Sequence, residues 1–307
     1  MLTDSLNSDR SAGLPPVWKT ETGLRVHPLS AGDETEVLDF LSGRPVHAVF
    51  IKGFIKENGL VNDLNRGEFY GCRNSEGRLL GVALLGHITL IETHIEAALR
   101  AFAEYARSVP SIYMILGEQE KVEWFWDSYS ICEDELRLQR RELLFVQQSA
   151  PPLFEPVPQL RLATVDDINI LLPVYGELHS QESDVNPMEV DPEGFKQRWL
   201  RRIRQKQVWV WTQGERLIFN ADVMCDTSDC IYLEGIYVAP EMRGKGYGLR
   251  CMSRLSQTLL AYTKSLCLLS DDRNLAADKF FRKAGYEMAG YYNTIFLPLQ
   301  NYSGCRK

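Results

Sequence analysis

The chain has 307 residues, of which 45% are hydrophobic and 24% are charged. This composition is typical of a globular protein with one large domain or two ordinary ones. The net charge of −7 argues against a dedicated nucleic-acid binder, because such proteins carry a surplus of Lys and Arg. No apolar run reaches the length of a membrane span, so neither nucleic acid nor a membrane is an expected partner.

The seven cysteines are scattered, form no CxxC pair and do not cluster with the five histidines. This pattern predicts reduced thiols and no metal site. Cys225 and Cys230 flank an expected hairpin turn and are interpreted as core-facing thiols. The first residues are polar and contain no apolar signal core, so we expect a cytoplasmic protein.

Residues 1–22 are expected to be a disordered lead-in, and residues 23–147 a first α/β domain. In this domain the apolar patterns predict strands at 24–28, 69–72, 79–85, 88–91 and 111–116, and helices at 33–41 and 94–106. The second helix is expected to bury Ile95, Leu99, Phe102 and Ala106. Residues 148–159 carry four prolines, which predicts an extended linker.

Residues 160–307 are predicted to form a second domain. Its strands are expected at 160–163, 208–212, 217–224, 231–238 and 266–270, with a further strand at the end. Its helices are expected at 164–178, 192–205 and 249–262, and from Asn274 onward. Thr164 and Asn274 are the predicted helix caps.

A basic, glycine-rich turn lies between the apolar strand at 231–238 and the next helix. It consists of Arg243, Gly244, Lys245, Gly246, Tyr247 and Gly248. Glycines tolerate positive φ and leave backbone N–H groups open to a phosphate, and the start of a helix attracts anions. The glycine spacing fits neither an NTPase phosphate loop nor a dinucleotide fingerprint. The turn therefore predicts a different phosphorylated ligand.

The turn resembles the Arg/Gln-x-x-Gly-x-Gly/Ala pyrophosphate loop of the GNAT acetyltransferases, which binds coenzyme A. A second signature of that family is matched downstream by Asn274, Ala277, Phe281, Gly285 and Tyr286. With the element order, the resemblance covers residues 160 to about 299. It implies a mixed α/β sheet flanked by helices and acetyl-CoA as co-substrate. It places Asn274 and Phe281 beside the cofactor.

The first domain repeats this outline without the basic turn, since Glu92-Thr93-His94 leads straight into a helix. We interpret residues 23–147 as a divergent GNAT-like half that lacks the cofactor loop, which makes the chain a tandem of GNAT-like domains. The alternative is an unrelated α/β domain with a similar element order.

The resemblance implies direct transfer of an acetyl group to a primary amine in a ternary complex. It assigns the main-chain N–H groups at Ile236, Tyr237 and Val238 to the thioester carbonyl, where negative charge develops. Glu234 is the candidate base, because a carboxylate inside an apolar strand is costly without a task or a partner. The alternative for Glu234 is a strand face that points to solvent.

Phe281 departs from the family pattern, because many members carry a tyrosine there as general acid. Tyr286, Tyr291 and Tyr292 are possible replacements. Otherwise the thiolate leaves unaided or through water, or the protein is a non-catalytic acyl-CoA-binding or regulatory module. A third possibility, an aminoacyl transferase that uses charged tRNA, fits poorly with the negative net charge and the intact turn.

The resemblance places the acceptor amine, either a small molecule or a peptide, beside residues 175–192. This segment is acidic, which suits a cationic amine, although it is equally a candidate for a solvated loop. Its acidic residues include Glu177, Glu182, Asp184 and Glu189. The basic run at 196–206 predicts a solvated helix face, a contact for an acidic partner or a contact for the cofactor 3′-phosphate. A homodimer is left open.

Overall fold

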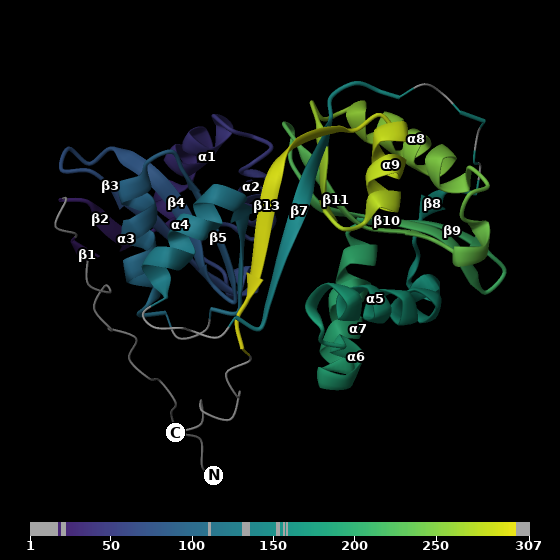
Figure 1. Ribbon diagram of the computed structural model, residues 1–307, viewed down its shortest axis with the longest axis horizontal. Helices are drawn as coiled ribbons and strands as arrows, with labels where there is room; N and C mark the ends of the chain where they lie inside the picture. The colour runs from purple at the N-terminus through teal and green to yellow at the C-terminus, as the bar shows by residue number, and fades with distance from the viewer. Residues whose placement is uncertain are drawn as a thin grey trace, which may run out of the picture.

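The computed structural model describes residues 18–19, 23–109, 112–130, 136–151, 154–155, 157 and 159–298. These residues form a mixed α/β structure around one sheet of 13 strands, in the order β1-β2-β3-β4-β5-β6-β13-β7-β12-β11-β10-β9-β8. Two halves lie side by side, and strands β7 and β13 run between them (Figure 1). The predicted fold class is therefore confirmed.

The N-terminal half places its strands in chain order and its helices on both faces of the sheet. Its strands are β1 (Trp18–Lys19), β2 (Arg25–Pro28), β3 (Gly67–Arg73), β4 (Leu79–Gly86), β5 (Ile88–Thr93), β6 (Met114–Glu118) and β7 (Leu138–Gln147). Its helices are α1 (Glu34–Ser42), α2 (Val49–Asn58), α3 (Glu96–Ala106) and α4 (Gln119–Tyr129), with single turns at Ala31–Asp33 and Asp63–Asn65.

The C-terminal half repeats this order. Its strands are β8 (Arg161–Leu162), β9 (Val208–Gln213), β10 (Arg216–Asp226), β11 (Ile231–Val238), β12 (Leu266–Asp271) and β13 (Glu287–Phe296). Its helices are α5 (Ile168–Ser183), α6 (Pro187–Val190), α7 (Pro192–Arg204), α8 (Tyr247–Leu260) and α9 (Leu275–Lys283), with single turns at Val165–Asp167 and Pro240–Met242.

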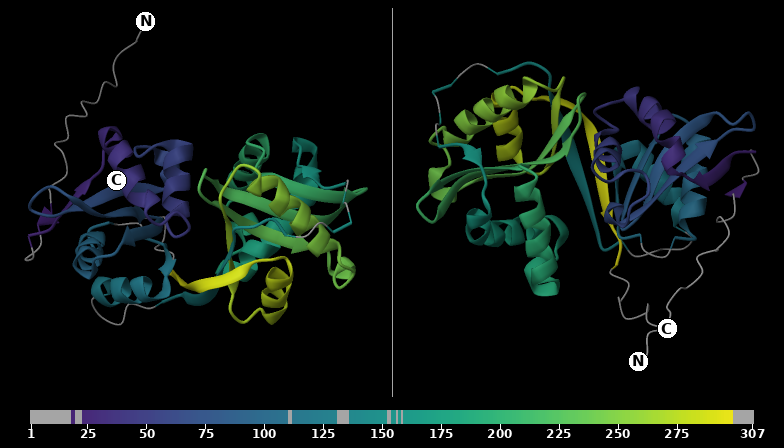
Figure 2. Two further views of the ribbon diagram at one scale, coloured as in Figure 1. Left: turned by 90° about the horizontal axis from the view of Figure 1, so that it is seen from above. Right: turned by 180° about the vertical axis from the view of Figure 1, so that it is seen from behind.

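The two halves exchange their last strands. Strand β7 of the N-terminal half pairs with β12, and β13 of the C-terminal half pairs with β6. The two exchanged strands also pair with each other, from Glu287↔Val146 to Phe296↔Leu138. Figure 2 shows the two exchanged strands from two further sides. The predicted division at residues 148–159 stays a prediction, while the sheet itself continues across both halves.

In each half the helices cover both faces of the sheet and bury separate cores. In the N-terminal half, α3 and α4 pack on one face and α1 and α2 on the other. In the C-terminal half, α8 and α9 cover one face, and α5 and α7 the other. Helix α2 joins the halves, because Val49 packs with Tyr232 and Tyr292 and the Lys52 ammonium lies 2.7 Å from the Asp229 carboxylate.

The structure corrects several sequence predictions in the N-terminal half. Helices α2 and α4 and strand β7 were not predicted. Ile95 is not buried by the third helix, since it precedes Glu96 and is 38% exposed. Trp18 and Lys19 form strand β1 within the segment expected to be disordered; the rest of residues 1–22 lie outside the described residues. Leu99, Phe102 and Ala106 are buried, as predicted.

In the C-terminal half most predicted elements are present with shifted ends. Helix α5 continues to Ser183 rather than ending near residue 178. Of the predicted linker, Val157 is buried in the core beneath α8. Cys225 of β10 and Cys230, which precedes β11, are free and buried, and Cys225 pairs in register with Tyr232 rather than with Cys230. Among the described residues, no helix is long and apolar enough to cross a bilayer.

Candidate active site

The basic turn follows β11 and leads into α8. Gly244 and Gly246 have φ angles of +73° and +81°, and a side chain added at either would meet nothing within 4 Å. Gly246 is the residue before α8, and no side chain caps this helix end. The turn therefore leaves the first N–H groups of α8 free of side-chain bonds and facing open space, as an anion site requires.

Gly248 has a different role from the one predicted. Its φ is not positive, and an added Cβ would lie 2.8 Å from a methyl group of Val238. Its absent side chain thus allows α8 to pack closely on β11. Arg243 turns back to the strand, where its Nε donates to the Val238 carbonyl at 3.0 Å. This bond ties the start of the turn to the end of β11.

Strands β11 and β12 separate beside this turn. They pair in parallel only at Ile231↔Leu266 and Tyr232↔Cys267. Beyond these pairs β11 continues to Val238, and residues 234–238 are partly exposed. The predicted carbonyl-binding segment at Ile236, Tyr237 and Val238 lies in this stretch, which pairs with β10 on one side and has no partner in β12 on the other. Its backbone therefore borders the opening between β11 and β12.

A bulge in β11 lies at the start of the opening. Gly235 has a φ of +60°, and the pairing register with β10 shifts between Asn220 and Asp222. The side chain of Asn220 donates to the Gly235 carbonyl at 2.9 Å, and an added Cβ on Gly235 would lie 2.2 Å from the Asp222 carboxylate. Only glycine therefore fits the bulge.

A buried polar network supports the bulge from below. The Tyr175 hydroxyl lies 2.7 Å from an Asp222 carboxylate oxygen and 3.0 Å from the side-chain oxygen of Asn220. Asn220 also donates to Asp222 at 3.1 Å. Burial raises the pKa of Asp222 to about 7. This network was not predicted, although the two polar residues inside the apolar strand LIFNADVM indicate buried polar groups that need partners.

Glu234 lies one residue before the bulge and forms an ion pair. Arg202 of α7 donates to its carboxylate at 2.7 Å, and the Glu234 side chain remains 34% exposed. The guanidinium of Arg202 also lies 5.1 Å from the ring centre of Trp199. The prediction that the run at 196–206 is a solvated helix face is therefore wrong for Arg202. The sequence signal for this contact was that Arg202 follows the buried Trp199 by three residues, which places both on the same side of the helix.

The negative charge of Glu234 affects a second carboxylate, that of Glu182. Burial, and then the negative charges of Glu234 and Glu142, raise the pKa of Glu182 to about 7. The Glu182 side chain is nevertheless accessible to solvent. The Glu182 carbonyl accepts a bond from Arg140 of β7 at 3.1 Å. The segment 175–192 is thus largely helical, and it packs on the exchanged strand.

The second sequence signature forms α9 as predicted, but its aromatic residue is in the core. Asn274 caps the helix by accepting from the Ala277 N–H at 3.1 Å, and Gly285 ends it with a φ of +91°. Phe281 is 6% exposed and packs against Phe145. Its ring therefore contributes to packing under α9. The predicted cofactor contacts of Asn274 and Phe281 stay predictions.

The three tyrosines considered as replacement acids have contacts elsewhere. Tyr286 is 2% exposed, and its hydroxyl lies 3.3 Å from Ser256 inside the core. The Tyr292 hydroxyl lies 2.9 Å from Nδ1 of His47 in the N-terminal half. Tyr291 lines a cavity of that half. None of these contacts places a hydroxyl at the opening between β11 and β12.

Comparison with known proteins agrees with this geometry. The sequence profile of the family described as "Acetyltransferase (GNAT) domain" matches residues 204–288, which include the bulge, the basic turn and α9. The C-terminal half contains a GNAT domain. The match ends at residue 288, and no curated protein sequence matches the chain.

Solved structures extend the likeness to the whole two-part fold. A GNAT-family acetyltransferase from Colwellia psychrerythraea is 13% identical with a TM-score of 0.57, and the match covers 88% of this chain and 98% of that one. A Drosophila protein is 12% identical with a TM-score of 0.62, over 89% and 98%. A tandem GNAT protein from the clavulanic acid biosynthesis pathway is 12% identical with a TM-score of 0.53, over 89% and 97%. At these identities the likeness shows a tandem GNAT fold.

Proposed function

We propose that the C-terminal GNAT domain is an acetyl-CoA-dependent N-acetyltransferase. The acetyl group would pass to a primary amine by direct attack while both substrates are bound. The observation that carries this proposal is the open turn at residues 243–248, with two positive-φ glycines before an uncapped helix start. Backbone N–H groups in such a turn suit a diphosphate, and Lys245 adds positive charge.

The opening between β11 and β12 supports the same assignment. Acetyl-CoA supplies an activated thioester, and its carbonyl needs a hydrogen-bond donor as negative charge develops on the oxygen. The bulge at Gly235 shifts the pairing register of β11 against β10, and the backbone that follows it has no partner in β12. We assign the N–H groups at Ile236, Tyr237 and Val238 to this task, and the network below Gly235 to holding them in place.

Two carboxylates are available to accept the proton of the amine. Glu234 lies on β11 beside the bulge, where Arg202 holds it in one position. Glu182 has a pKa of about 7, which is near the value that favours general-base catalysis at neutral pH. We propose Glu234 as the base, with Glu182, whose pKa the charge of Glu234 helps to raise, as a second acceptor. Their negative charge also suits a cationic small-molecule or peptide amine.

The departing thiolate has no tyrosine donor at Phe281. Thiols are acidic enough for the thiolate to leave without strong acid assistance, since a free thiol has a pKa of about 8.5. The proposed reaction therefore needs no general acid from the chain.

The test uses the purified full-length protein in two assays. Calorimetry with acetyl-CoA should show binding that is lost in Gly246→Asp, whose carboxylate would repel the diphosphate. A thiol-release assay with a panel of primary amines should then show turnover. Binding without turnover on a broad panel would replace the proposal with the non-catalytic acyl-CoA-binding protein. Absence of binding at millimolar acetyl-CoA would overturn both.

A further inference from the structure

The exchanged strand β7 brings side chains of the N-terminal half beside the opening between β11 and β12. Glu142 of β7 pairs in register with Asp271 at the end of β12, and Leu144, two residues further on, packs in one cluster with Tyr232 of β11. Because residues two apart on a strand share a face, Glu142 lies on the same face of the sheet as Tyr232 and Glu234. The N-terminal half therefore contributes to the face that carries the proposed base.

Glu142 has one carboxylate oxygen without a close partner. Its Oε2 accepts from the Thr294 hydroxyl at 2.5 Å, whereas its Oε1 lies 4.0 Å from the Arg140 guanidinium, which is beyond hydrogen-bonding distance. Arg140 is engaged elsewhere, because it lies 3.4 Å from the Asp271 carboxylate and donates to the Glu182 carbonyl at 3.1 Å. Burial raises the pKa of Glu142, as expected for a carboxylate that lacks a sufficient cation.

The hydroxyl of Tyr232 has no partner either. Tyr232 is 8% exposed, and its ring centre lies 4.4 Å from that of Phe50 of α2. Within the part of the chain that the structure describes, its hydroxyl forms no hydrogen bond, although buried polar groups are nearly always bonded. Burial raises its pKa well above the usual value, and the charges of Glu234, Glu142 and Glu182 add to the shift. A protonated hydroxyl therefore lies close to three carboxylates and is available to a ligand.

The charged groups at the end of this opening leave an excess of negative charge. Arg202 pairs with the proposed base at 2.7 Å, and Asp271 is shared by Arg140 and Arg273 at 3.4 and 2.7 Å. Among the described residues, four carboxylates thus face these three guanidinium groups; the carboxylates are Glu142, Glu182, Glu234 and Asp271. At least one further cation would be needed to balance them.

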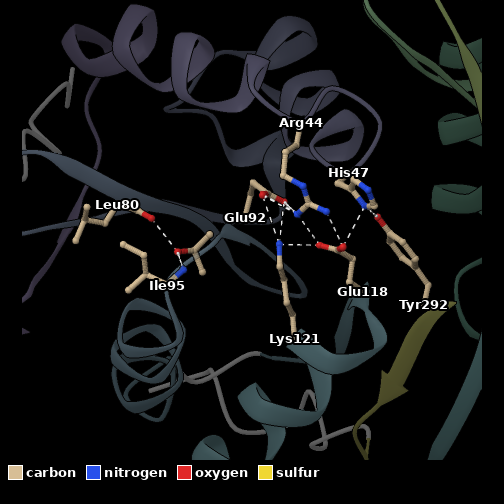
Figure 3. Close-up of polar contacts among 9 residues, drawn as sticks. Arg44, His47, Leu80, Glu92, Ile95, Glu118, Lys121 and Tyr292 are labelled. Carbon is tan, nitrogen blue, oxygen red and sulfur yellow. Dashed lines mark hydrogen bonds and ion pairs between the residues drawn. The ribbon is translucent and has the colours of Figure 1, made fainter. Parts of the chain in front are cut away.

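The corresponding carboxylate of the N-terminal half, Glu92, belongs to a balanced cluster. Arg44 lies 3.1 Å from Glu92 and 2.6 Å from Glu118, and Lys121 lies 3.4 and 2.6 Å from the same two carboxylates. Figure 3 shows the two cations between the two glutamates. Although burial opposes ionisation, Arg44 and Lys121 lower the pKa of Glu118 to about 2. The raised pKa values at the C-terminal opening indicate the opposite state, in which a cation is missing.

The attacking nitrogen of the acceptor cannot supply this cation during the transfer. A nucleophilic amine must be neutral, because a protonated nitrogen has no free electron pair. An acceptor with a second ammonium group would keep one positive charge beside the carboxylates throughout the reaction.

We propose that the acceptor of the C-terminal GNAT domain is an amine with a second cationic group, and that Glu142 of the exchanged strand and the Tyr232 hydroxyl hold that group. This inference rests on the proposed acetyl transfer, because it names the class of acceptor. It also makes the N-terminal half a part of the acceptor site.

The test measures binding and transfer separately, with linear diamines of increasing length and the monoamine of each length. Calorimetry on the full-length protein, with CoA as the product that allows no transfer and again without it, should find at least one diamine that binds about tenfold more tightly than its monoamine. Thiol release from acetyl-CoA should show the same preference in kcat/KM. Diamine binding without thiol release would support the site and overturn the acetyl transfer. Turnover of monoamines with no preference for any diamine would overturn this inference alone.

Two variants assign the preference to the named groups. Glu142→Gln retains an acceptor for the Thr294 hydroxyl, and it should reduce the ratio of diamine to monoamine affinity about tenfold. Tyr232→Phe should weaken diamine binding about fivefold. Thermal denaturation should find Tyr232→Phe no less stable than wild type, because its hydroxyl has no partner to lose. A loss of stability with unchanged diamine binding would show that the hydroxyl is structural and overturn its role.

Asp272→Asn is the matched control for Glu142→Gln. The Asp272 side chain is 17% exposed and pairs with Arg141, while that of Glu142 is 13% exposed and lies beside Arg140. Arg140 and Arg141 are neighbours on β7 and point to opposite faces of the sheet. Asp272→Asn therefore removes the same charge from the other face and should leave the affinity ratio unchanged. An equal change in this control, or an unchanged ratio in Glu142→Gln, would overturn the role of the exchanged strand.

Discussion

The two halves carry a glutamate at the same place in the sheet, and they use it differently. Glu92 and Glu234 each lie two residues beyond the last parallel pair of their half, Leu90↔Leu116 and Tyr232↔Cys267. Each forms an ion pair with an arginine from the helical segment before β3 or β9, Arg44 or Arg202. The frame and the carboxylate position are therefore shared.

The difference lies in what surrounds the shared position. Glu92 is 3% exposed and has a second cation, Lys121. Glu234 has one cation and is followed by the Gly235 bulge. The connection to the next helix is residues 94–95 in one half and residues 239–246 in the other. The two halves thus share the frame, while the bulge and the long glycine turn, on which the proposed cofactor site depends, are found in the C-terminal half.

The largest expected effect on activity comes from replacing each of the two glutamates by glutamine in separate variants. Glu234→Gln should lower kcat by about 100-fold, because it removes the proposed base. Glu92→Gln should leave kcat unchanged and lower the free energy of unfolding by about 2 kcal/mol, since Arg44 and Lys121 lose one of their two carboxylate partners and keep Glu118. Steady-state kinetics and urea denaturation measure the two effects. Loss of stability without loss of activity in Glu234→Gln would contradict the assignment.

The second comparison concerns turn glycines. Gly246→Ala should raise the KM for acetyl-CoA about tenfold, because a left-handed alanine costs about 1 kcal/mol and its Cβ projects toward the proposed diphosphate. Gly77→Ala is the control, since Gly77 has a φ of +85° and equally open surroundings in the β3–β4 hairpin. Both variants should lose similar stability in thermal denaturation. A changed KM in Gly77→Ala would show that strain, not the site, is responsible.

The third comparison tests the network below the bulge. Tyr175→Phe removes a hydrogen bond to Asp222 and should lower kcat about fivefold by loosening the carbonyl-binding segment. Tyr70→Phe is matched to it, because the Tyr70 hydroxyl donates to Glu68 at 2.6 Å in the other half. Each variant should cost about 1 kcal/mol of stability. Only Tyr175→Phe should change kcat at saturating substrate.

The smallest effect is a change in pH dependence. A base acts only without its proton, so wild-type kcat/KM should rise through pH 7 if Glu182, whose pKa is about 7, accepts the proton. Glu182→Gln should flatten this rise, whereas Glu189→Gln on α6 should retain it. An unchanged profile in Glu182→Gln would leave Glu234 as the sole base.

The raised pKa of Glu182 also predicts how the stability of the fold changes with pH. The folded state raises the pKa of Glu182 above the value of 4.5, so the folded form binds the proton more tightly than the unfolded chain. Stability contributed by this group therefore falls as the pH rises from about 4.5 to 7. Thermal denaturation at pH 8 should find Glu182→Gln at least as stable as wild type.

The C-terminal half was largely predictable because its signals are local. A glycine turn before a helix, and an Asn cap with a Gly stop, are short patterns that determine their own backbone geometry. Helix α7 and strands β9, β10 and β11 have regular apolar periods, and their predicted ranges agree closely with the structure.

The features that were missed depend on contacts distant in the sequence. The sequence of helix α2 is largely an apolar run. The position of the helix is fixed by its packing against Tyr232 and Tyr292, between the two halves. The pairing of Arg202 with Glu234 joins two elements that have no common local pattern. Strand β7 has a polar run (residues 139–142) followed by an apolar run (residues 143–146) and no regular alternation, and only its partners from the other half determine its register.

The exchange of β7 and β13 has a consequence for synthesis of the chain. Strand β6 pairs on one side with β5 and on the other with β13, so that side has no partner until residues 287–296 leave the ribosome. During translation the N-terminal half must therefore wait, with an open sheet edge, for almost the whole second half to be made. A nascent chain halted before β13 should be a substrate for holdase chaperones, and release of the last strand should free it.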